Sequence, residues 1–366
     1  MTERRLSRRA PDPGAVDAGR RLRLARLAAG LTQSQLADLC GVSRQAVSGA
    51  EAGSWSPSLG VALQLARVLG TSVDQLFAVE LHPREVATTA LGPGRPTARA
   101  RMAQVWDQWV ALPLTEDRAM ITGFTAATGR LVKAGEAQIW GGGRSLVIAG
   151  CDPALALLAE PVEMAREGWT VEWWACSSGA AQRLLEAGLI HAAAVHRSKD
   201  KTAGRVDVRS RARIGFASWR EGVLLRPSAS AENPKSLEDV LRLEFRWVNR
   251  EVGSEARTLL DRELARLGIS GATLDGYSSH AAGHLQVASA IASGIADAGI
   301  ATEPAALAYG LNFLPLSEEE CALHVDRDRL DTTELRLLLH ALGGAGLGRE
   351  LAALPGYDTA ILGSEL

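Results

Sequence analysis

The sequence has 366 residues, enough for two or three domains, and its 46% hydrophobic and 22% charged residues exclude a chain that is disordered throughout. Its formal net charge of −2 excludes binding to polyanions through bulk charge alone, although arginines gather in the first thirty residues. Four widely separated cysteines form no C-x-x-C pair, and no apolar run of about 18 residues predicts a membrane span. Because the N-terminus also lacks the apolar core of a secretory signal, we expect a cytoplasmic protein.

The chain divides into four predicted regions. Residues 1–16 form a basic flexible arm, and residues 17–79 form a compact helical domain with short turns. Residues 80–143 open with a stretch rich in proline and glycine, and we expect a linker and a short β-rich connector with two strands, over 103–111 and 119–124. Residues 144–366 form the largest region, which we expect to bind a ligand.

The largest region alternates between apolar strand-like runs and helical stretches. Strands are predicted at 146–150, 170–175 and 191–196, with helices over 153–167 and 180–187 between them. This alternation is typical of parallel α/β layers. The predicted fold class is therefore multidomain, with an all-α head and an α/β domain.

The helical domain has the pattern of a helix-turn-helix. Thr32 and Gln35 have the spacing of a capping box, Gly41 supplies a tight turn, and Ser43 caps a helix predicted over Arg44–Glu51. Two helices joined by such a turn place the second one, the recognition helix, in the major groove of DNA.

Polar side chains at the start of these two helices are the candidate DNA contacts. Arg44 and Gln45 are side-chain types that read guanine and adenine, and Ser48 reaches bases or phosphate from the same helix. Gln33 opens the preceding helix and is expected to meet a phosphate. The predicted DNA-binding residues are Gln33, Ser43, Arg44, Gln45 and Ser48.

Longer strings in this domain point to a family. They are Leu31-Thr32-Gln33-x-x-Leu36-Ala37, Gly41-Val42-Ser43, Glu51-x-Gly53-x-x-x-Pro57-Ser58, and Val73-Asp74-Gln75-Leu76-Phe77. Together they cover about sixty residues and resemble the Cro/repressor, or XRE-type, helix-turn-helix family. The resemblance implies five helices and a homodimer on double-stranded operator DNA, with half-sites about 34 Å apart. The alternative is a helical bundle that serves only as a dimerisation cap.

In the α/β region, polar residues gather where predicted strands end and helices begin. Asp152 follows the first strand, Ser177 and Ser178 follow the second, and residues 249–254 precede a helix that carries Arg257. Parallel α/β sheets bind ligands at these strand ends, where helix N-termini offer free N–H groups. The predicted ligand-binding residues are Asp152, Ser177, Ser178, Asn249, Arg250, Ser254, Arg257, His284 and Glu303.

Several of these residues have another interpretation. Asp152 is alternatively a helix cap, and Arg257 the partner of Asp261 in an ion pair. His280 and His284 are four residues apart, as metal ligands on one helix would be, but no third ligand is evident and we predict no metal site. Catalytic motifs such as G-x-S-x-G and the P-loop are missing from the sequence, so we expect no enzymatic activity.

Three further strings are found in the same region: Ala149-Gly150-Cys151-Asp152-Pro153-Ala154-Leu155, Asn249-Arg250 with Gly253-Ser254, and Gly310-Leu311-Asn312-Phe313. They resemble the periplasmic-binding-protein-like domain related to molybdate and tungstate receptors. The resemblance implies the two-lobed type II fold of periplasmic binding proteins. Lobe 1 would be formed by about 144–226 and 316–366, and lobe 2 by about 227–315. The chain would cross between the lobes near Leu225–Asn233 and Leu314–Leu316.

The resemblance also implies how an oxyanion would bind, through serine hydroxyls, backbone N–H groups and one arginine. The run Gly253-Ser254-Glu255-Ala256-Arg257 departs from the family's Gly-Ser-Gly-Thr-Arg. The sequence predicts a one-component regulator with molybdate or tungstate as effector and no cofactor. The alternatives are a small organic anion, a molybdenum-cofactor intermediate, or an enzyme with an autoregulatory helix-turn-helix.

Overall fold

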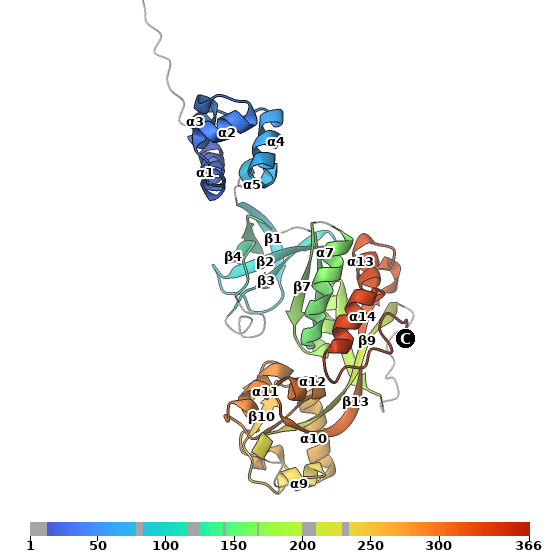
Figure 1. The fold of residues 1–366 in the computed structure, drawn as a ribbon. Coiled ribbons are helices and arrows are strands. Elements are labelled where there is room, and N and C mark those ends of the chain that lie inside the picture. Colours follow the sequence, from blue (N-terminus) through green and yellow to red (C-terminus); the bar gives the residue numbers. More distant parts are fainter. Residues whose placement is uncertain are drawn as a thin grey trace, which may run out of the picture. The chain divides into compact units, whose positions relative to one another are not determined.

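A computed structural model describes residues 13–77, 83–115, 124–141, 144–166, 168–199, 210–228 and 234–366 (Figure 1). The chain splits into two compact units, Met1–His82 and Pro83–Leu366. Most of the predicted basic arm, residues 1–12, lies outside the described residues, and the first helix begins at Pro13. Within the described ranges, no helix has the length and apolar character needed to cross a membrane.

The first unit is built from short helices around one apolar core. They are α1 (Pro13–Ala28), α2 (Gln33–Cys40), α3 (Arg44–Glu51), α4 (Leu59–Val68) and α5 (Val73–Phe77). Leu22, Leu36, Val47, Leu65 and Leu76 come from different helices and meet in this core, each at most 2% exposed. Burying these side chains holds together helices that are too short to be stable alone.

The helix caps that the sequence predicts are present at the ends of these helices. Thr32 and Gln35 form the predicted capping box, and Gly41 ends α2 in the left-handed conformation, with φ 63°. The Ser43 hydroxyl accepts the Ala46 N–H at 3.1 Å, so α3 begins at Arg44 as predicted. These caps fix the angle between α2 and α3.

The second unit begins with a small β layer. Its strands are β1 (Arg84–Ala90), β2 (Arg99–Val105), β3 (Gln108–Pro113), β4 (Gly129–Lys133) and β5 (Glu136–Ile139). The unbroken strand predicted over 103–111 is wrong, because Trp106 adopts a left-handed φ of 53° and turns β2 back into β3. No glycine or asparagine marked this turn. The strand predicted over 119–124 lies almost wholly outside the described residues. The layer continues the main sheet through the Gln104–Arg144 pairing, so it belongs to the second unit.

The rest of the second unit alternates strands and helices. The strands are β6 (Arg144–Gly150), β7 (Trp169–Ala175), β8 (Ala192–Ser198), β9 (Arg211–Leu225), β10 (Trp247–Arg250), β11 (His280–Ala281), β12 (Ala298–Thr302) and β13 (Asn312–Asp326). The helices are the 3-10 helix η1 (Pro153–Leu158), α7 (Ala159–Ala165), α8 (Ser178–Glu186), α9 (Leu237–Leu241), α10 (Glu255–Arg266), α11 (His284–Ala292), α12 (Glu303–Ala308), α13 (Thr333–Leu342) and α14 (Ala345–Ala353). The helix predicted over 153–167 is two helices, since Pro161 has no N–H to continue an α-helix through this point.

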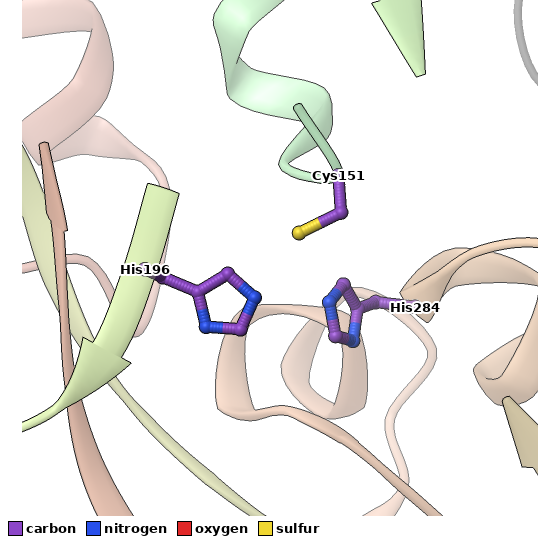
Figure 2. Close-up of side chains that lie close together, drawn as sticks. All are labelled: Cys151, His196 and His284. Carbon is purple, nitrogen blue, oxygen red and sulfur yellow. The ribbon is translucent and has the colours of Figure 1, made fainter. Parts of the chain in front are cut away.

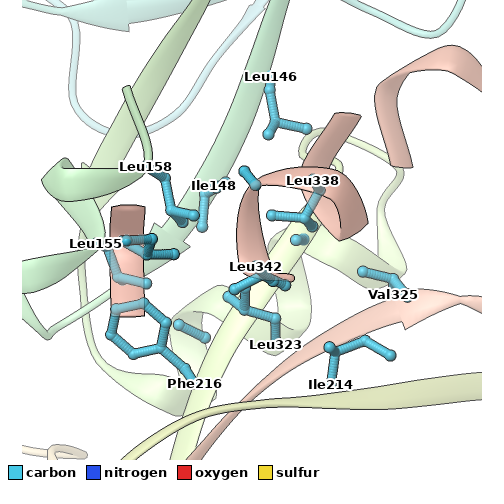
Figure 3. Packing of buried hydrophobic residues seen from close by; sticks show 14 of the residues in the cluster. Leu146, Ile148, Leu155, Leu158, Ile214, Phe216, Leu323, Val325, Leu338 and Leu342 are labelled. Atoms are coloured by element: carbon cyan, nitrogen blue, oxygen red, sulfur yellow. The ribbon is translucent and has the colours of Figure 1, made fainter. Parts of the chain in front are cut away.

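Two long antiparallel strands, β9 and β13, run through both halves of this α/β fold. The first half has the strand order β7-β6-β8-β13-β9, and the second has β11-β10-β12-β9-β13. Each half has its own core, with Leu146, Phe216 and Leu338 in the first (Figure 3) and Trp247 and Leu260 in the second.

The crossing point on β9 lies earlier than the predicted 225–233. Pairing of β9 with β12 in the second half already starts at Glu221, and β13 has a bulge between Pro315 and Ser317. A Cβ atom on Gly222 would lie 2.1 Å from the Leu314 carbonyl oxygen, so glycine is needed where the strands pass between the halves.

His191 connects the β layer to the first half. The side chain is 1% exposed, its Nδ1 accepts the Val147 N–H at 2.9 Å, and its ring meets Trp106 edge-on at 4.6 Å. Burial and the nearby Arg329 guanidinium lower the pKa of His191 to about 3. The folded protein therefore holds this imidazole neutral across the range where a free histidine gains a proton.

Replacing His191 with asparagine is expected to reduce the loss of stability in acid. Below the unfolded pKa of about 6.5 the unfolded chain binds a proton that the folded chain excludes, so the free energy of unfolding falls by about 1.4 kcal/mol per pH unit. The His191→Asn variant keeps an acceptor for Val147 and should lose about 2 kcal/mol less than wild type between pH 6.5 and 5. Urea unfolding followed by tryptophan fluorescence measures this difference. Parallel pH profiles would show that His191 does not set it.

Candidate functional site

The helix-turn-helix presents polar side chains on the first two turns of α3. Arg44, Gln45 and Ser48 are exposed, while the hydroxyl of exposed Ser43 is used as the helix cap. The side chains of Arg44, Gln45 and Ser48 are therefore accessible, as the predicted contacts with a DNA major groove require.

A nearly buried ion pair holds this helix in place. The Arg26 side chain on α1 is 9% exposed, and its Nε lies 2.5 Å from Oε1 of Glu51, at the end of α3. Gln33, the predicted phosphate contact, donates its side-chain N–H to Glu51 at 2.8 Å. Burial opposes ionisation of Glu51, but the hydrogen bonds from Arg26 and Gln33 outweigh it and lower the pKa of this carboxyl. The network connects α1, α2 and α3.

A second cluster of polar side chains lies in the α/β fold, where its two halves meet. Cys151 directly follows β6, His196 lies on β8, and His284 is the first residue of α11. The Cys151 sulfur and one nitrogen of each ring all lie within 4.8 Å of one another. His196 and His284 are 4% and 3% exposed, and Figure 2 shows both rings and the thiol directed toward one point.

Two buried carboxylates lie near the Nδ1 atoms of the histidine rings. Glu319 on β13 places Oε2 at 3.3 Å from Nδ1 of His196 and accepts the Ser317 hydroxyl at 2.7 Å. Glu221 on β9 is 0% exposed, with Oε1 at 4.0 Å from Nδ1 of His284. Among the described residues, neither Glu221 oxygen has a hydrogen-bond partner.

The two histidines differ in protonation. Burial opposes a charge on His196, but Cys151 and Glu319 outweigh it, and the pKa of His196 is raised well above its ordinary value. Burial, Arg250 and His196 lower the pKa of His284 far below its ordinary value. Burial raises the pKa of Glu221 to about 7. The cluster therefore combines an imidazole that burial keeps neutral, His284, with one that its neighbours favour in the protonated form, His196.

Arg250 and the start of α11 enclose a small cavity beside this cluster. The guanidinium on β10 is 2% exposed, and its Nε and Nη2 donate to Glu251 at 2.8 and 2.9 Å. Its buried Nη1 has no hydrogen-bond partner within the described part of the chain. The cavity has a volume of about 30 Å³, and its lining includes Cys151, Trp173, Arg250, Gly283 and His284. The N-cap of α11 is Gly283, which has no side chain to accept the first N–H groups of the helix. A cation and a helix N-terminus together suit an anion.

Asp152 adjoins the cluster and caps η1. Its Oδ1 accepts the Ala154 N–H at 2.7 Å, and the Tyr357 hydroxyl donates to the carboxylate at 2.9 Å. Burial raises the pKa of Asp152 to about 6, against the effect of these two hydrogen bonds. Asp152 is therefore a helix cap in the structure, which was the alternative interpretation of this residue from the sequence.

Two of the three predicted serines also serve as helix caps. Ser177 accepts the Ala180 N–H, and Ser254 accepts the Arg257 N–H at 3.3 Å while donating to the Glu251 carbonyl. The Ser178 hydroxyl accepts the His196 backbone N–H at 3.3 Å. These side chains support the loops around the small cavity.

The remaining predicted residues have partners of their own. Asn249 donates to the Tyr277 carbonyl, and Arg257 forms the ion pair with Asp261 that the sequence analysis left as its alternative. Glu303 pairs with Arg220. Of the nine predicted ligand-binding residues, the cavity therefore brings together Arg250 and His284, with Asp152 next to them.

Sequence reasoning did not identify Cys151, His196, Glu221 and Glu319 as a set. Cys151 directly follows β6, and His196 lies near the end of β8. Because these strands are parallel, their ends lie at one edge of the sheet, and the sequence could have indicated that the two residues are close together. His280, considered with His284 as a metal pair, lies on β11 and not on α11, so the two do not share a helix face.

Comparisons with known proteins agree with this division of the chain. Residues 17–78 match a family described as a helix-turn-helix domain, and residues 159–343 match the PBP superfamily domain. The restriction-modification controller protein C.AhdI from Aeromonas hydrophila is 43% identical, over 17% of this chain and 96% of that chain, with a TM-score of 0.17.

Two curated proteins are related in sequence. YvgK of Bacillus subtilis (strain 168) is 35% identical over 134 residues, which are 36% of this chain and 43% of that protein. A Clostridium pasteurianum protein, described by its position in the 5′ region of the ferredoxin 2Fe-2S gene, is 34% identical over 101 residues. That match covers 27% of this chain and 89% of the clostridial protein. The chain thus spans less than half the length of the first of these relatives.

Proposed function

Since this chain belongs to the PBP superfamily and carries a helix-turn-helix domain, we propose that it is a one-component regulator that binds operator DNA in response to a small ligand. A homodimer would place two copies of α3 on a pseudopalindromic operator, because the symmetry of the half-sites mirrors that of the protein. The proposal assigns the cavity between the two halves to binding and not to catalysis.

One observation carries the proposal for the ligand. Arg250 is almost fully buried, and its Nη1 has no hydrogen-bond partner among the described residues although it lines a cavity. A buried donor of this kind is costly unless it is paired, and an anion beside it would be paired by the guanidinium and by the N–H groups that open α11. These donors suit an oxyanion, and we propose molybdate or tungstate; the cavity of about 30 Å³ has room for about one water molecule, so it would have to widen on binding.

A second cavity favours the alternative ligand, a small organic anion. It has a volume of about 250 Å³, also includes His284, and is lined mainly by apolar side chains such as Leu157, Leu285 and Ala305. An organic ligand could place its charged group near His284 and its apolar part in this cavity.

Closure of the two halves supplies the regulatory step. The cavity takes Cys151 and Trp173 from the first half, and Arg250 and His284 from the second. A ligand that touches both halves binds the closed arrangement better than the open one and so shifts the equilibrium toward it. Coupling between this equilibrium and DNA binding would make the chain ligand-responsive.

Calorimetric titration with molybdate, tungstate and sulfate tests the ligand assignment. We expect Arg250→Met to weaken binding of molybdate or tungstate by about 10- to 100-fold, since hydrogen bonds to charged groups contribute roughly 1.5–3 kcal/mol. Arg257→Met is the matched control, because Arg257 already pairs with Asp261, and it should bind like wild type. Thermal unfolding of each variant checks that it is folded. If none of the three oxyanions binds, the oxyanion assignment fails, and the DNA-binding assignment is unaffected.

A further inference from the structure

We propose that Cys151, His196 and His284 form a binding site for a divalent transition metal ion of the Zn²⁺ or Co²⁺ class. The three residues come from β6, β8 and α11, and their donor atoms all lie within 4.8 Å of one another. A thiolate with two imidazoles is a ligand set that such ions prefer to Mg²⁺ or Ca²⁺. Three protein ligands leave one position of a tetrahedral ion open.

A carboxylate lies on the Nδ1 side of each histidine ring. Glu319 lies 3.3 Å from Nδ1 of His196, which leaves Nε2 of that ring for a metal, and Glu221 lies 4.0 Å from Nδ1 of His284, just beyond hydrogen-bond distance. Metal-binding histidines commonly have a carboxylate at the second nitrogen, which fixes the tautomer and the ring plane. In Figure 2 both imidazoles and the sulfur face a common point, as this arrangement requires.

His284 supplies an independent observation. Its side chain is 3% exposed, and within the described chain neither ring nitrogen has a hydrogen-bond partner. Burying a polar group without a partner is unfavourable, and native proteins satisfy almost all such groups. A metal on Nε2 would satisfy one nitrogen of His284 and would draw Glu221 toward the other.

The local charge also suits a cation. Glu221 and Glu319 are buried beside the three ligands, and Arg250, which lines the adjoining cavity, forms an ion pair with Glu251. Cys151 must lose its proton when it binds a metal ion. The positive charge of the ion would then be balanced by this thiolate and by the buried carboxylates.

The site also bears on regulation, a consequence that rests on the proposed function. Cys151 and His196 belong to the first half of the α/β fold, and His284 belongs to the second. An ion held by all three residues would bind only when the halves are together, and it would stabilise that arrangement. Its open position would adjoin the small cavity at Arg250, where an anion could become the fourth ligand.

Titration of the full chain with Co²⁺, after removal of metals by a chelator, tests the inference. We expect one Co²⁺ per chain, with a thiolate-to-cobalt absorption band and visible bands of a tetrahedral ion that added Zn²⁺ abolishes. Cys151→Ser should remove the thiolate band, and His196→Gln and His284→Gln should each weaken Co²⁺ binding by about tenfold or more. Cys176→Ser is the control, because Cys176 follows the neighbouring strand β7 and is outside the group of three.

Two results would overturn the metal site: no cobalt spectrum in the folded chain, or a thiolate band that survives Cys151→Ser. Rapid alkylation of Cys151 in a chain that binds no Co²⁺ would instead identify a reactive thiol activated by His196 and Glu319. Operator binding by the metal-free chain separates the two proposals. If operator binding persists without any cobalt site, only the metal inference fails. If cobalt binds as expected and no DNA is bound, the proposed function fails and the metal site stands.

Discussion

Glu51→Ala is expected to unfold the helix-turn-helix domain while the α/β unit stays folded. The change leaves the Arg26 guanidinium, with a side chain only 9% exposed, without the carboxylate that pairs with its Nε and Nη2. It also removes the acceptor of Gln33. Removing one partner of a buried ion pair costs about 3–5 kcal/mol. A domain of this size has a total stability of only about 3–9 kcal/mol.

Hydrogen exchange of the full chain, read by mass spectrometry, measures this effect in each unit. Peptides from α1 to α3 should lose protection in Glu51→Ala, and peptides from β9 and β13 should keep it. Asp38→Ala, at an exposed site on α2, is the matched control and should change stability by less than about 0.5 kcal/mol. Normal protection of α3 in the Glu51→Ala variant would show that the ion pair does not hold the helix.

The same pair makes the domain sensitive to acid. The pKa of Glu51 is lowered in the folded state, so its contribution is present above the unfolded pKa of about 4.3 and is lost as the pH falls toward the folded pKa. Glu51→Gln keeps an acceptor without the charge, and its domain should be less stable than wild type at pH 7 but change less between pH 5 and 3.

Arg44→Ala and Gln45→Ala are expected to weaken operator binding by about 1–3 kcal/mol each, or roughly 5- to 150-fold. Both side chains are exposed on the first turn of α3, where a recognition helix meets base edges. Fluorescence anisotropy at a fixed salt concentration, with an operator selected from random DNA, measures the loss. Gln64→Ala, an exposed glutamine on α4, is the control and should bind like wild type.

Random DNA separates base reading from phosphate contact. Loss of a base contact should reduce operator affinity far more than affinity for random DNA, because random binding depends mainly on phosphates. Equal losses on both DNAs would reassign Arg44 to a phosphate contact. Unchanged operator binding in both variants would show that α3 does not read the sequence.

The helix-turn-helix could be predicted closely because its signals are local. The capping box at Thr32 and the Ser43 cap act over three residues, and the left-handed turn at Gly41 over one. Where the prediction was wrong, a distant contact decides the local structure. The turn at Trp106 has no glycine or asparagine at its left-handed position, but the Trp106 ring packs on His191 and lies under the Arg329 guanidinium at 4.1 Å.

The candidate site shows the same limit. Arg250 and His284 could be predicted, because strand ends and helix starts are visible in the sequence. The cluster around them could not be assembled from spacing, since His196 and Glu319 are 123 residues apart and meet only through the pairing of β8 with β13. Ser177 and Ser254 have a local role that the sequence does not separate from ligand binding, because a residue type that binds anions also caps helices.

Operator affinity with and without tungstate or molybdate tests the central claim most directly, namely that the α/β cavity controls DNA binding. The account predicts that a saturating oxyanion changes the operator affinity of the wild-type chain by about 5- to 150-fold, and that Arg250→Met abolishes this change while still binding DNA. An operator affinity that stays constant, with tungstate shown by calorimetry to be bound at the cavity, would contradict it.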